Sequence, residues 1–251
     1  MIPRVIPCLL LKNGGLVKTV NFKNEKYIGD PINAVKVFNE KEVDELVFLD
    51  ITKSNDLVDP NYDLLKDISS EAFMPMAYGG GLNSIRQIER IYSIGFEKVI
   101  INSSAFENIQ VIKDAVNLAG SSGVVVSVDT KSSFFSKRRI YSRSGSLKHN
   151  VDLLDHIKKM EDAGAGEILL GSIDKDGTFS GYDLELIKNI SSNTSIPVVP
   201  VGGAGKLEHF KQAINAGASG VAAGSMFVYH GKHKAVLITY PEYETIKELF
   251  N

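Results

Sequence analysis

The chain has 251 residues, of which 43% are hydrophobic and 23% charged, a globular composition that excludes disordered, collagenous and coiled-coil proteins. Its 28 basic and 30 acidic residues leave a net charge of −2, so we expect neither nucleic acid nor an anionic membrane surface as a partner. The single cysteine, Cys8, cannot form an internal disulfide, and no apolar stretch approaches the ~20 residues of a membrane span, so a cytoplasmic protein is expected.

Short apolar runs recur along the chain, and segments with helical periodicity lie between them. The expected strands are Arg4–Lys12, Glu45–Asp50, Phe73–Tyr78, Lys98–Asn102, Gly123–Asp129, Glu167–Ser172, Ile196–Val201 and Gly220–Ala223. The clearest expected helices are Pro31–Asn39, Ser84–Ser93, Asn108–Gly120, Val151–Ala163, Asp183–Ser191 and Lys206–Ala216. Nearly continuous apolar strands are typical of a parallel sheet buried on both faces. Eight strand–helix units in a chain of this length predict an α/β protein, a (β/α)8 TIM barrel, as a single domain over residues 1–251.

An internal repeat divides the expected barrel into two halves. Three pairs of segments share an offset of about 122 residues, namely Leu46–Thr52 with Ile168–Asp174, Tyr78–Leu82 with Val201–Gly205, and Val99–Phe106 with Val221–Phe227. A fourth pair, Leu9–Lys12 with Val128–Lys131, follows at a similar offset. Four matches in order predict two fused half-barrels.

The repeat also indicates where ligands bind. Its parts lie where strands end, and catalytic groups of TIM barrels lie at the carboxyl ends of strands. Glycine at such a turn lets backbone N–H groups approach an anion closely. The candidate phosphate-binding residues are Gly81, Asn102 and Ser103 in one half, and Gly202, Gly203, Gly224 and Ser225 in the other. Two such sites across one mouth would suit an elongated bisphosphate, and the duplication favours this over the alternative that the glycines serve only to make tight turns.

The whole chain resembles the cyclase subunit of imidazole glycerol phosphate synthase, an enzyme of histidine synthesis. The segments that carry the resemblance are Arg4–Leu9, Val17–Phe22, Gly29–Pro31, Asp44–Thr52, Gly79–Gly81, Lys98–Asn102, Gly164–Leu170, Ser172–Thr178 and Gly202–Lys206. The resemblance implies a heterodimer in which a glutaminase at the bottom of the barrel supplies ammonia. The ammonia crosses the barrel and attacks a ribulosyl bisphosphate at the top.

The resemblance also implies roles for individual residues. It assigns catalysis to Asp129 at the end of strand 5, with help from Lys18, and substrate binding to Asp50 and Asp176. In the family, a second aspartate at the end of strand 1 completes a general acid–base pair. We expect no cofactor, and no metal because the five histidines lack metal-ligand spacing.

This sequence departs from the family at the strand-1 aspartate. The position is Leu10, which cannot transfer a proton, and the internal repeat places Leu10 opposite Asp129. Losing one member of an acid–base pair typically reduces a rate by roughly 10²–10⁴-fold. Three further departures, Gly171, Val201 and Tyr78, are expected at the same mouth. Together they suggest a changed ligand.

The opposite end of the barrel keeps the family pattern. The family's gate of alternating charges is matched by Arg4, Glu45, Lys98 and Glu167 at strand starts, and Glu97 matches an acidic position at the glutaminase interface. Buried charges at a barrel end must be paired, so an alternative is that these four merely plug it.

Three functions therefore remain open. The first is a paralogue that supplies ammonia, together with an ATP-dependent sugar amidotransferase, for the amidation of a surface-polysaccharide sugar. The second is a genuine cyclase that uses Asp129 with a relocated acid such as Lys12 or Asp50. The third is a barrel without chemistry that docks and activates a glutaminase. All three share the fold and the glutaminase partner.

Overall fold

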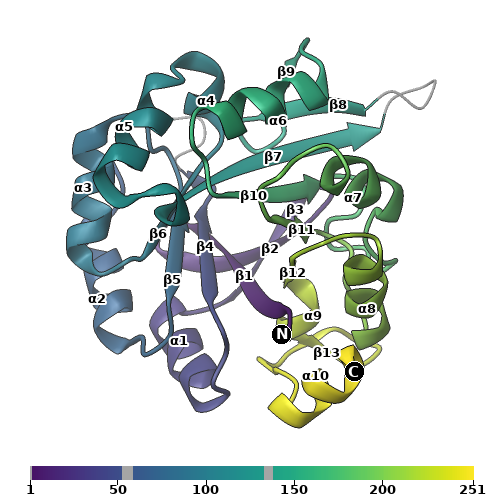
Figure 1. Cartoon of the computed structure of the whole chain (residues 1–251). Coiled ribbons are helices and arrows are strands. Elements are labelled where there is room, and N and C mark those ends of the chain that lie inside the picture. The colour runs from purple at the N-terminus through teal and green to yellow at the C-terminus, as the bar shows by residue number, and fades with distance from the viewer. Residues whose placement is uncertain (1, 53–58, 133–137) are drawn as a thin grey trace.

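A closed barrel of eight parallel strands forms the centre of the computed structural model, which describes residues 2–52, 59–132 and 138–251 (Figure 1). Its strands are β1 (Arg4–Lys12), β4 (Leu46–Asp50), β5 (Met76–Gly79), β6 (Lys98–Ile101), β7 (Val124–Ser132), β10 (Glu167–Ser172), β11 (Val198–Val201) and β12 (Gly220–Ala223). Each strand pairs with the next in this order, and β12 pairs with β1 to close the barrel. The predicted TIM barrel is confirmed.

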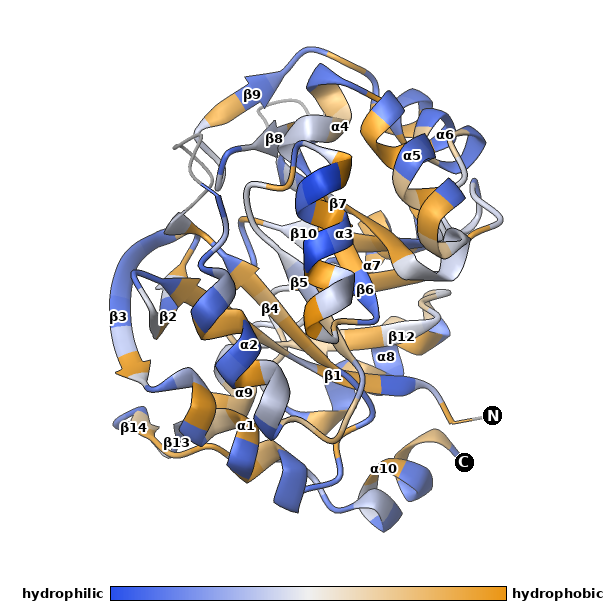
Figure 2. Cartoon of the chain, turned by 90° about the vertical axis from the view of Figure 1, so that its left-hand side faces the viewer, coloured by the Kyte–Doolittle hydropathy of each residue, from blue (hydrophilic) through white to orange (hydrophobic). Residues whose placement is uncertain are grey.

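Helices between the strands cover the outside of the barrel. They are α1 (Pro31–Glu40), α2 (Tyr62–Glu71), α3 (Ile85–Ile94), α5 (Gln110–Ala119), α6 (Leu153–Asp162), α7 (Leu184–Ser191), α8 (Leu207–Asn215) and α10 (Tyr243–Phe250). Asp30, Asn61, Asp152 and Asp183 begin four of them, each accepting a backbone N–H from the first turn. Figure 2 shows apolar barrel strands surrounded by helices of alternating hydropathy. In the part of the chain that the structure describes, no helix is long and apolar enough to cross a membrane.

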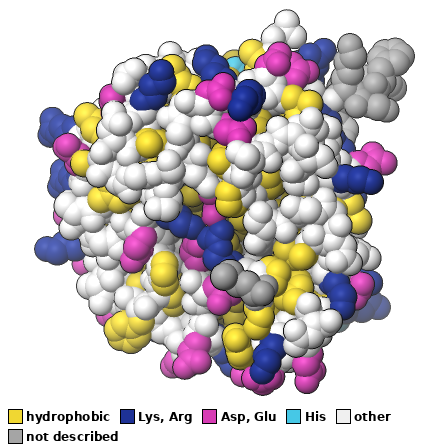
Figure 3. All heavy atoms as spheres, viewed as in Figure 1, with side chains coloured by type: hydrophobic (Ala, Val, Ile, Leu, Met, Phe, Trp, Pro, Cys, Tyr) yellow, Lys and Arg dark blue, Asp and Glu magenta, His cyan; other side chains and the backbone are white. Residues whose placement is uncertain are grey.

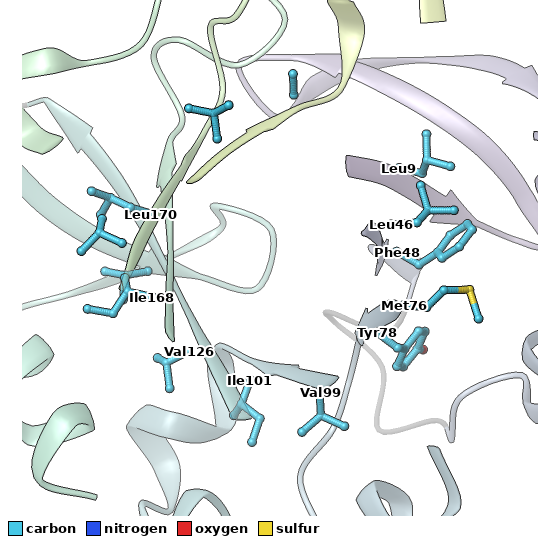
Figure 4. Close-up of a cluster of buried hydrophobic side chains, with 14 of the residues drawn as sticks. Leu9, Leu46, Phe48, Met76, Tyr78, Val99, Ile101, Val126, Ile168 and Leu170 are labelled. Carbon is cyan, nitrogen blue, oxygen red and sulfur yellow. The ribbon is translucent and has the colours of Figure 1, made fainter. Parts of the chain in front are cut away.

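Strand periodicity divides the buried side chains into two cores. Successive residues of a strand point to opposite faces. The barrel interior is filled by a small cluster, Ile6, Cys8, Val47, Ala77, Ile100, Val125, Leu169, Val199 and Ala222. A larger cluster lies between strands and helices, and Figure 4 shows its side chains, Phe48 and Tyr78 among them, pointing away from the barrel axis. The same alternation points Leu10 and Asp129 inward, at the upper rim of the interior.

The structure repeats itself in the way that the sequence repeat predicts. An antiparallel hairpin follows the first strand of each half, β2 (Gly15–Val20) with β3 (Lys23–Gly29), and β8 (Arg138–Ser142) with β9 (Leu147–His149). A short helix follows the fourth strand of each half, α4 (Ser103–Glu107) and α9 (Ser225–Val228). The residues before these helices, Asn102 and Gly224, share a backbone conformation, with φ, ψ of −122°, −80° and −109°, −77°.

The remaining elements are small. They are the 3-10 turn η2 (Ser121–Gly123) and the hairpin of β13 (Tyr229–His230) with β14 (Ala235–Val236). On the face shown in Figure 3, acidic and basic side chains are interspersed. This agrees with the near-neutral net charge of the sequence.

Candidate functional site

A cavity of about 770 Å³ opens at the carboxyl ends of the barrel strands. Every residue that the sequence predicts for catalysis or ligand binding lines it, namely Lys18, Asp50, Gly81, Asn102, Ser103, Asp129, Asp176, Gly202, Gly203, Gly224 and Ser225. The parallel topology explains the gathering, because all eight strands end at the same mouth.

Asp129 lies on the polar side of this cavity. Asn102 Nδ2, at the end of β6, donates a hydrogen bond to Asp129 Oδ2 at 2.8 Å. Burial raises the pKa of Asp129 to about 7; the Asn102 hydrogen bond opposes this shift, and the charge of Asp176 adds to it. A carboxyl group with a pKa near neutrality can both accept and donate a proton, as acid–base chemistry requires.

Lys18 and Leu10 form the opposite side. Leu10 points inward from β1 and lines the cavity. Lys18 is only 5% exposed, and its Nζ donates to the carbonyl oxygen of Cys8 at 2.6 Å. Burial lowers the pKa of Lys18, which brings its amine closer to neutrality. Lys18 therefore places a buried basic group on the side of the cavity that Leu10 lines.

The two relocated acids suggested by the sequence are engaged elsewhere. Lys12 forms an ion pair with Glu25 at the rim of the cavity. Asp50 is buried, its Oδ1 accepts the backbone N–H of Thr52 at 3.0 Å, and its Oδ2 lies 3.5 Å from the Tyr78 hydroxyl. The Asp50 carboxylate thus lines the cavity beside the Tyr78 hydroxyl and does not occupy the position of Leu10.

A cluster of four charges lies at the opposite end of the barrel interior. Arg4 pairs with Glu45 and, at 2.5 Å, with Glu167. Lys98 Nζ lies 2.9 Å from Glu45 and 3.5 Å from Glu167. The four residues predicted as a gate therefore form one alternating ring of ion pairs below the interior core. Glu97, predicted for the partner interface, is exposed beside it, and its carboxylate accepts the Met76 backbone N–H at 2.7 Å.

The family whose description is "Histidine biosynthesis protein" matches residues 4–234 of this chain. The chain belongs to that family. A Pseudomonas aeruginosa protein, provisionally named imidazole glycerol phosphate synthase subunit hisF2, is 48% identical over 95% of this chain and 96% of its own length. A provisionally named HisF subunit of Leptospira borgpetersenii is 49% identical over 99% and 98%, and the HisF subunit of Endomicrobium trichonymphae is 43% identical over 90% and 87%. The protein is thus a HisF-type chain.

The three other departures from the family pattern do not all lie in the cavity. Gly171 and Val201 line the cavity, as predicted. A Cβ atom on Gly171 would lie 2.2 Å from Asp129 Oδ1, so the missing side chain leaves the space that the Asp129 carboxylate occupies. The prediction for Tyr78 was wrong in part, because its ring packs outside the barrel, 5.8 Å from Phe96, and only its hydroxyl approaches the mouth, near Asp50.

Backbone geometry at the glycine turns is suited to anions. Gly81, Gly202 and Gly203 have φ of 65°, 100° and 108°, the left-handed region that glycine adopts without strain. All three glycines line the cavity. The residues described by the structure include no group of three or more His, Cys, Asp or Glu side chains that could hold a metal ion.

Several contacts between lining residues were not predicted from the sequence. Thr19 Oγ1 donates to Asp176 Oδ2 at 2.6 Å, and the Phe22 backbone N–H donates to the same oxygen at 3.1 Å, which ties the β2–β3 hairpin to the loop after β10. Arg143, in the turn of the β8–β9 hairpin, donates its backbone N–H to Ser103 Oγ at 3.2 Å. The polar hairpin sequences carried no signal for these contacts, because a hairpin's docking partner is far away in the chain.

Proposed function

We propose that this HisF-type barrel is the ammonia-using subunit of a two-subunit glutamine amidotransferase. A glutaminase docks at the amino ends of the strands, and ammonia passes the ring of Arg4, Glu45, Lys98 and Glu167 into the barrel. Two features support this docking face. Phe73, in the connection from α2 to β5 at this end, is 90% exposed, and an exposed aromatic side chain is typical of an interface anchor. The relatives' names also describe a subunit of imidazole glycerol phosphate synthase.

The ammonia acceptor is proposed to differ from the cyclase substrate. The observation that carries this proposal is Leu10, which points inward opposite Asp129 at the position where cyclisation needs a second proton-transferring group. Asp129 and Lys18 remain as the catalytic residues. The glycine turns hold a phosphorylated ligand, with Asp50 and Asp176 contacting its polar groups. The end use is amidation of a surface-polysaccharide sugar, completed by an ATP-dependent sugar amidotransferase.

A specific observation favours the genuine cyclase as the second candidate. Asp129 has a pKa raised by burial to about 7, and Lys18 lies buried on the opposite side of the same cavity with its pKa lowered. An aspartic acid and an amine that both titrate nearer to neutrality could share the proton transfers of cyclisation. In this reading Lys18 takes the place of the missing aspartate.

The experiment that separates the two is a cyclase assay with free ammonium. Ammonium salt bypasses the glutaminase, so formation of imidazole glycerol phosphate from the ribulosyl bisphosphate substrate tests only the barrel mouth. We expect a rate roughly 10²–10⁴-fold below that of an ordinary cyclase, increased by Leu10→Asp. Turnover at an ordinary rate that is lost in both Asp129→Asn and Lys18→Met would establish the cyclase reading.

A second assay tests the barrel as an activator without chemistry. Glutaminase turnover is measured with wild-type barrel and with Asp129→Ala, in the presence of the sugar amidotransferase and its acceptor. Equal glutaminase rates with loss of amidated sugar in the variant support a chemical role for Asp129. Equal yields of amidated sugar would leave Asp129 without a role and contradict the proposal.

A further inference from the structure

Three aromatic rings form a flat stack beside the cavity, and no step of the proposed reaction uses them. Phe106, on α4, is sandwiched between His149 at the end of β9 and His156 on α6. The Phe106 and His149 ring centroids are 3.7 Å apart at 10°, and those of Phe106 and His156 are 4.2 Å apart at 2°. Two nearly parallel rings on both faces of one phenylalanine fix the direction of α4.

The stack connects the β8–β9 hairpin to the predicted anion turn. His149 Nε2 lies 2.7 Å from Ser142 Oγ, which joins the two strands of the hairpin. The Arg143 backbone N–H donates to Ser103 Oγ at 3.2 Å, and Arg143 Nη2 pairs with Glu107 at 3.0 Å. All these contacts converge on α4, which begins directly after Asn102.

The position of α4 in turn determines the chemistry of the cavity. Asn102 holds Asp129 Oδ2 through its Nδ2 at 2.8 Å, and Ser103 lines the cavity as the next residue. Any rotation of α4 therefore moves an Asp129 partner and an anion-facing turn together. Phe106 lies one helical turn beyond Asn102 and is the residue through which α6 and β9 restrain that motion.

We propose that the stack of His149, Phe106 and His156 is a proton-sensitive latch that holds the β8–β9 hairpin against α4 and so keeps the Asn102–Ser103 turn in its anion-binding position. Phe106 and the two histidines are positioning residues, since none is proposed to touch the ligand. The proposal rests on the proposed phosphate-binding role of this turn. Its regulatory part is that mild acid opens the latch.

Charge and burial around the two imidazoles determine the direction of the pH effect. Burial, together with the charges of His149 and Lys159, lowers the pKa of His156 to about 4. Burial also lowers the pKa of His149, with Arg143 adding to the shift and Glu107 opposing it. His156 Nε2 is buried with no hydrogen-bond partner among the described residues, so nothing there compensates an added charge.

Linkage between proton binding and stability determines whether acid opens or closes the latch. With the latch closed, both histidines bind protons less readily than a solvent-exposed histidine, whose pKa is about 6.5. Protons therefore favour the open latch, and the closed state loses stability as the pH falls from about 6.5 toward about 4. Above that range both rings are neutral and the latch stays closed.

The other half-barrel provides an internal control. There the short helix α9 carries Phe227, which packs between Phe210 at 6.0 Å and Tyr240 at 5.3 Å. Neither neighbour gains or loses a proton in mild acid, because phenylalanine does not titrate and burial raises the pKa of Tyr240 above its ordinary value of ~10. The Gly224–Ser225 turn should therefore bind an anion equally well at neutral and mildly acidic pH.

The test is a titration of the full chain with inorganic sulfate, which keeps its charge throughout this pH range. The backbone amide NMR signals of Ser103 and Ser225 report on the two turns separately. The pKa of Asp129 lies near 7 beside this turn, so every chain in the titration carries Asp129→Asn, and wild type denotes the chain with His156 intact. At about pH 5 we expect the sulfate dissociation constant at Ser103 to rise at least fivefold relative to about pH 7.5, and that at Ser225 to stay within twofold. His156→Phe keeps the stack without a titrating ring and should abolish most of the change at Ser103. Phe106→Leu should weaken binding at Ser103 at both pH values.

The outcomes distinguish the latch from the phosphate site. An equal acid effect in wild type and His156→Phe, or equal weakening at both turns, overturns the latch. If neither amide responds to sulfate at neutral pH, the phosphate-binding proposal is wrong, and the latch is then judged by amide hydrogen exchange in β8 and β9. After correction for intrinsic rates, acid should speed that exchange in wild type and not in His156→Phe, and identical behaviour of the two would overturn the latch as well.

Discussion

At the scale of one residue, the buried carboxyl group of Asp129 reduces the stability of the fold when it ionises. Burial raises its pKa to about 7, so the folded chain keeps this proton while the unfolded chain releases it near pH 3.9. A raised carboxyl pKa means that stability falls as the pH rises from about 4 to about 7. Ionising the group in the folded state therefore costs up to about 4 kcal/mol, since one pKa unit corresponds to ~1.4 kcal/mol.

The first prediction follows from that cost. Asp129→Asn cannot ionise and keeps an oxygen for the Asn102 hydrogen bond, so it should raise the free energy of unfolding at about pH 8 by roughly 2–4 kcal/mol, with little change at about pH 4.5. Urea denaturation followed by circular dichroism at both pH values measures it. Asp67→Asn, on the exposed side of α2, is the matched control and should show no gain. A gain of equal size at both pH values would contradict a buried, protonated Asp129.

The β2–β3 hairpin illustrates the scale of one element. Asp176 Oδ2 accepts from both Thr19 Oγ1 and the Phe22 backbone N–H, at 2.6 and 3.1 Å, and these bonds hold the hairpin over the cavity. Asp176→Ala should speed amide exchange in residues 15–29 by roughly 10- to 100-fold, because losing hydrogen bonds to a charged group costs ~1.5–3 kcal/mol. Exchange in β10 should not change, since its ladder bonds to β7 and β11 remain. Thr19→Val removes one of the two bonds and should give a smaller effect, whereas faster exchange in β10 would mean that Asp176 supports the barrel itself.

Elements also differ in how well the sequence predicts them. The eight barrel strands were predicted because both of their faces are buried, which produces nearly continuous apolar runs such as Glu167–Ser172. The hairpin strand β3 was missed because five of its seven residues are exposed and polar or aromatic, which leaves no apolar pattern. Helix α2 was not among the clearest predicted helices for a similar reason, because only Leu65 and Ile68 in it are buried.

At the scale of the whole molecule, the sequence predicts the parts of the site that depend on strand topology but not the contacts that depend on side-chain packing. Parallel topology brings all strand ends to one mouth, so residues far apart in sequence, such as Asn102 and Gly224, could be assigned to one cavity. Contacts that depend on side-chain packing could not be assigned in this way. The stack around Phe106 joins three elements whose relative positions only the folded barrel defines.

The charge ring at the amino end of the barrel gives the last prediction. Glu45 accepts from both Arg4 and Lys98, so Glu45→Ala leaves two cations sharing Glu167 in a partly buried space. Breaking a buried pair in this way costs about 3–5 kcal/mol, whereas replacing both partners with apolar residues is often neutral. Glu45→Met combined with Lys98→Met should therefore regain most of the stability that Glu45→Ala loses, as measured by urea denaturation.

The same double variant tests whether ammonia passes through the ring of charges or whether the ring only closes the end of the barrel. If ammonia passes through the ring, product formed with glutamine and the glutaminase should fall several-fold in Glu45→Met/Lys98→Met, while product formed with free ammonium stays unchanged, since ammonium enters at the open mouth of the cavity. Leu118→Met, on the exposed side of α5, is a control that should affect neither route. Equal glutamine-dependent and ammonium-dependent yields in the stable double variant would mean that the four charges only close the barrel, because their removal would then have no consequence beyond packing.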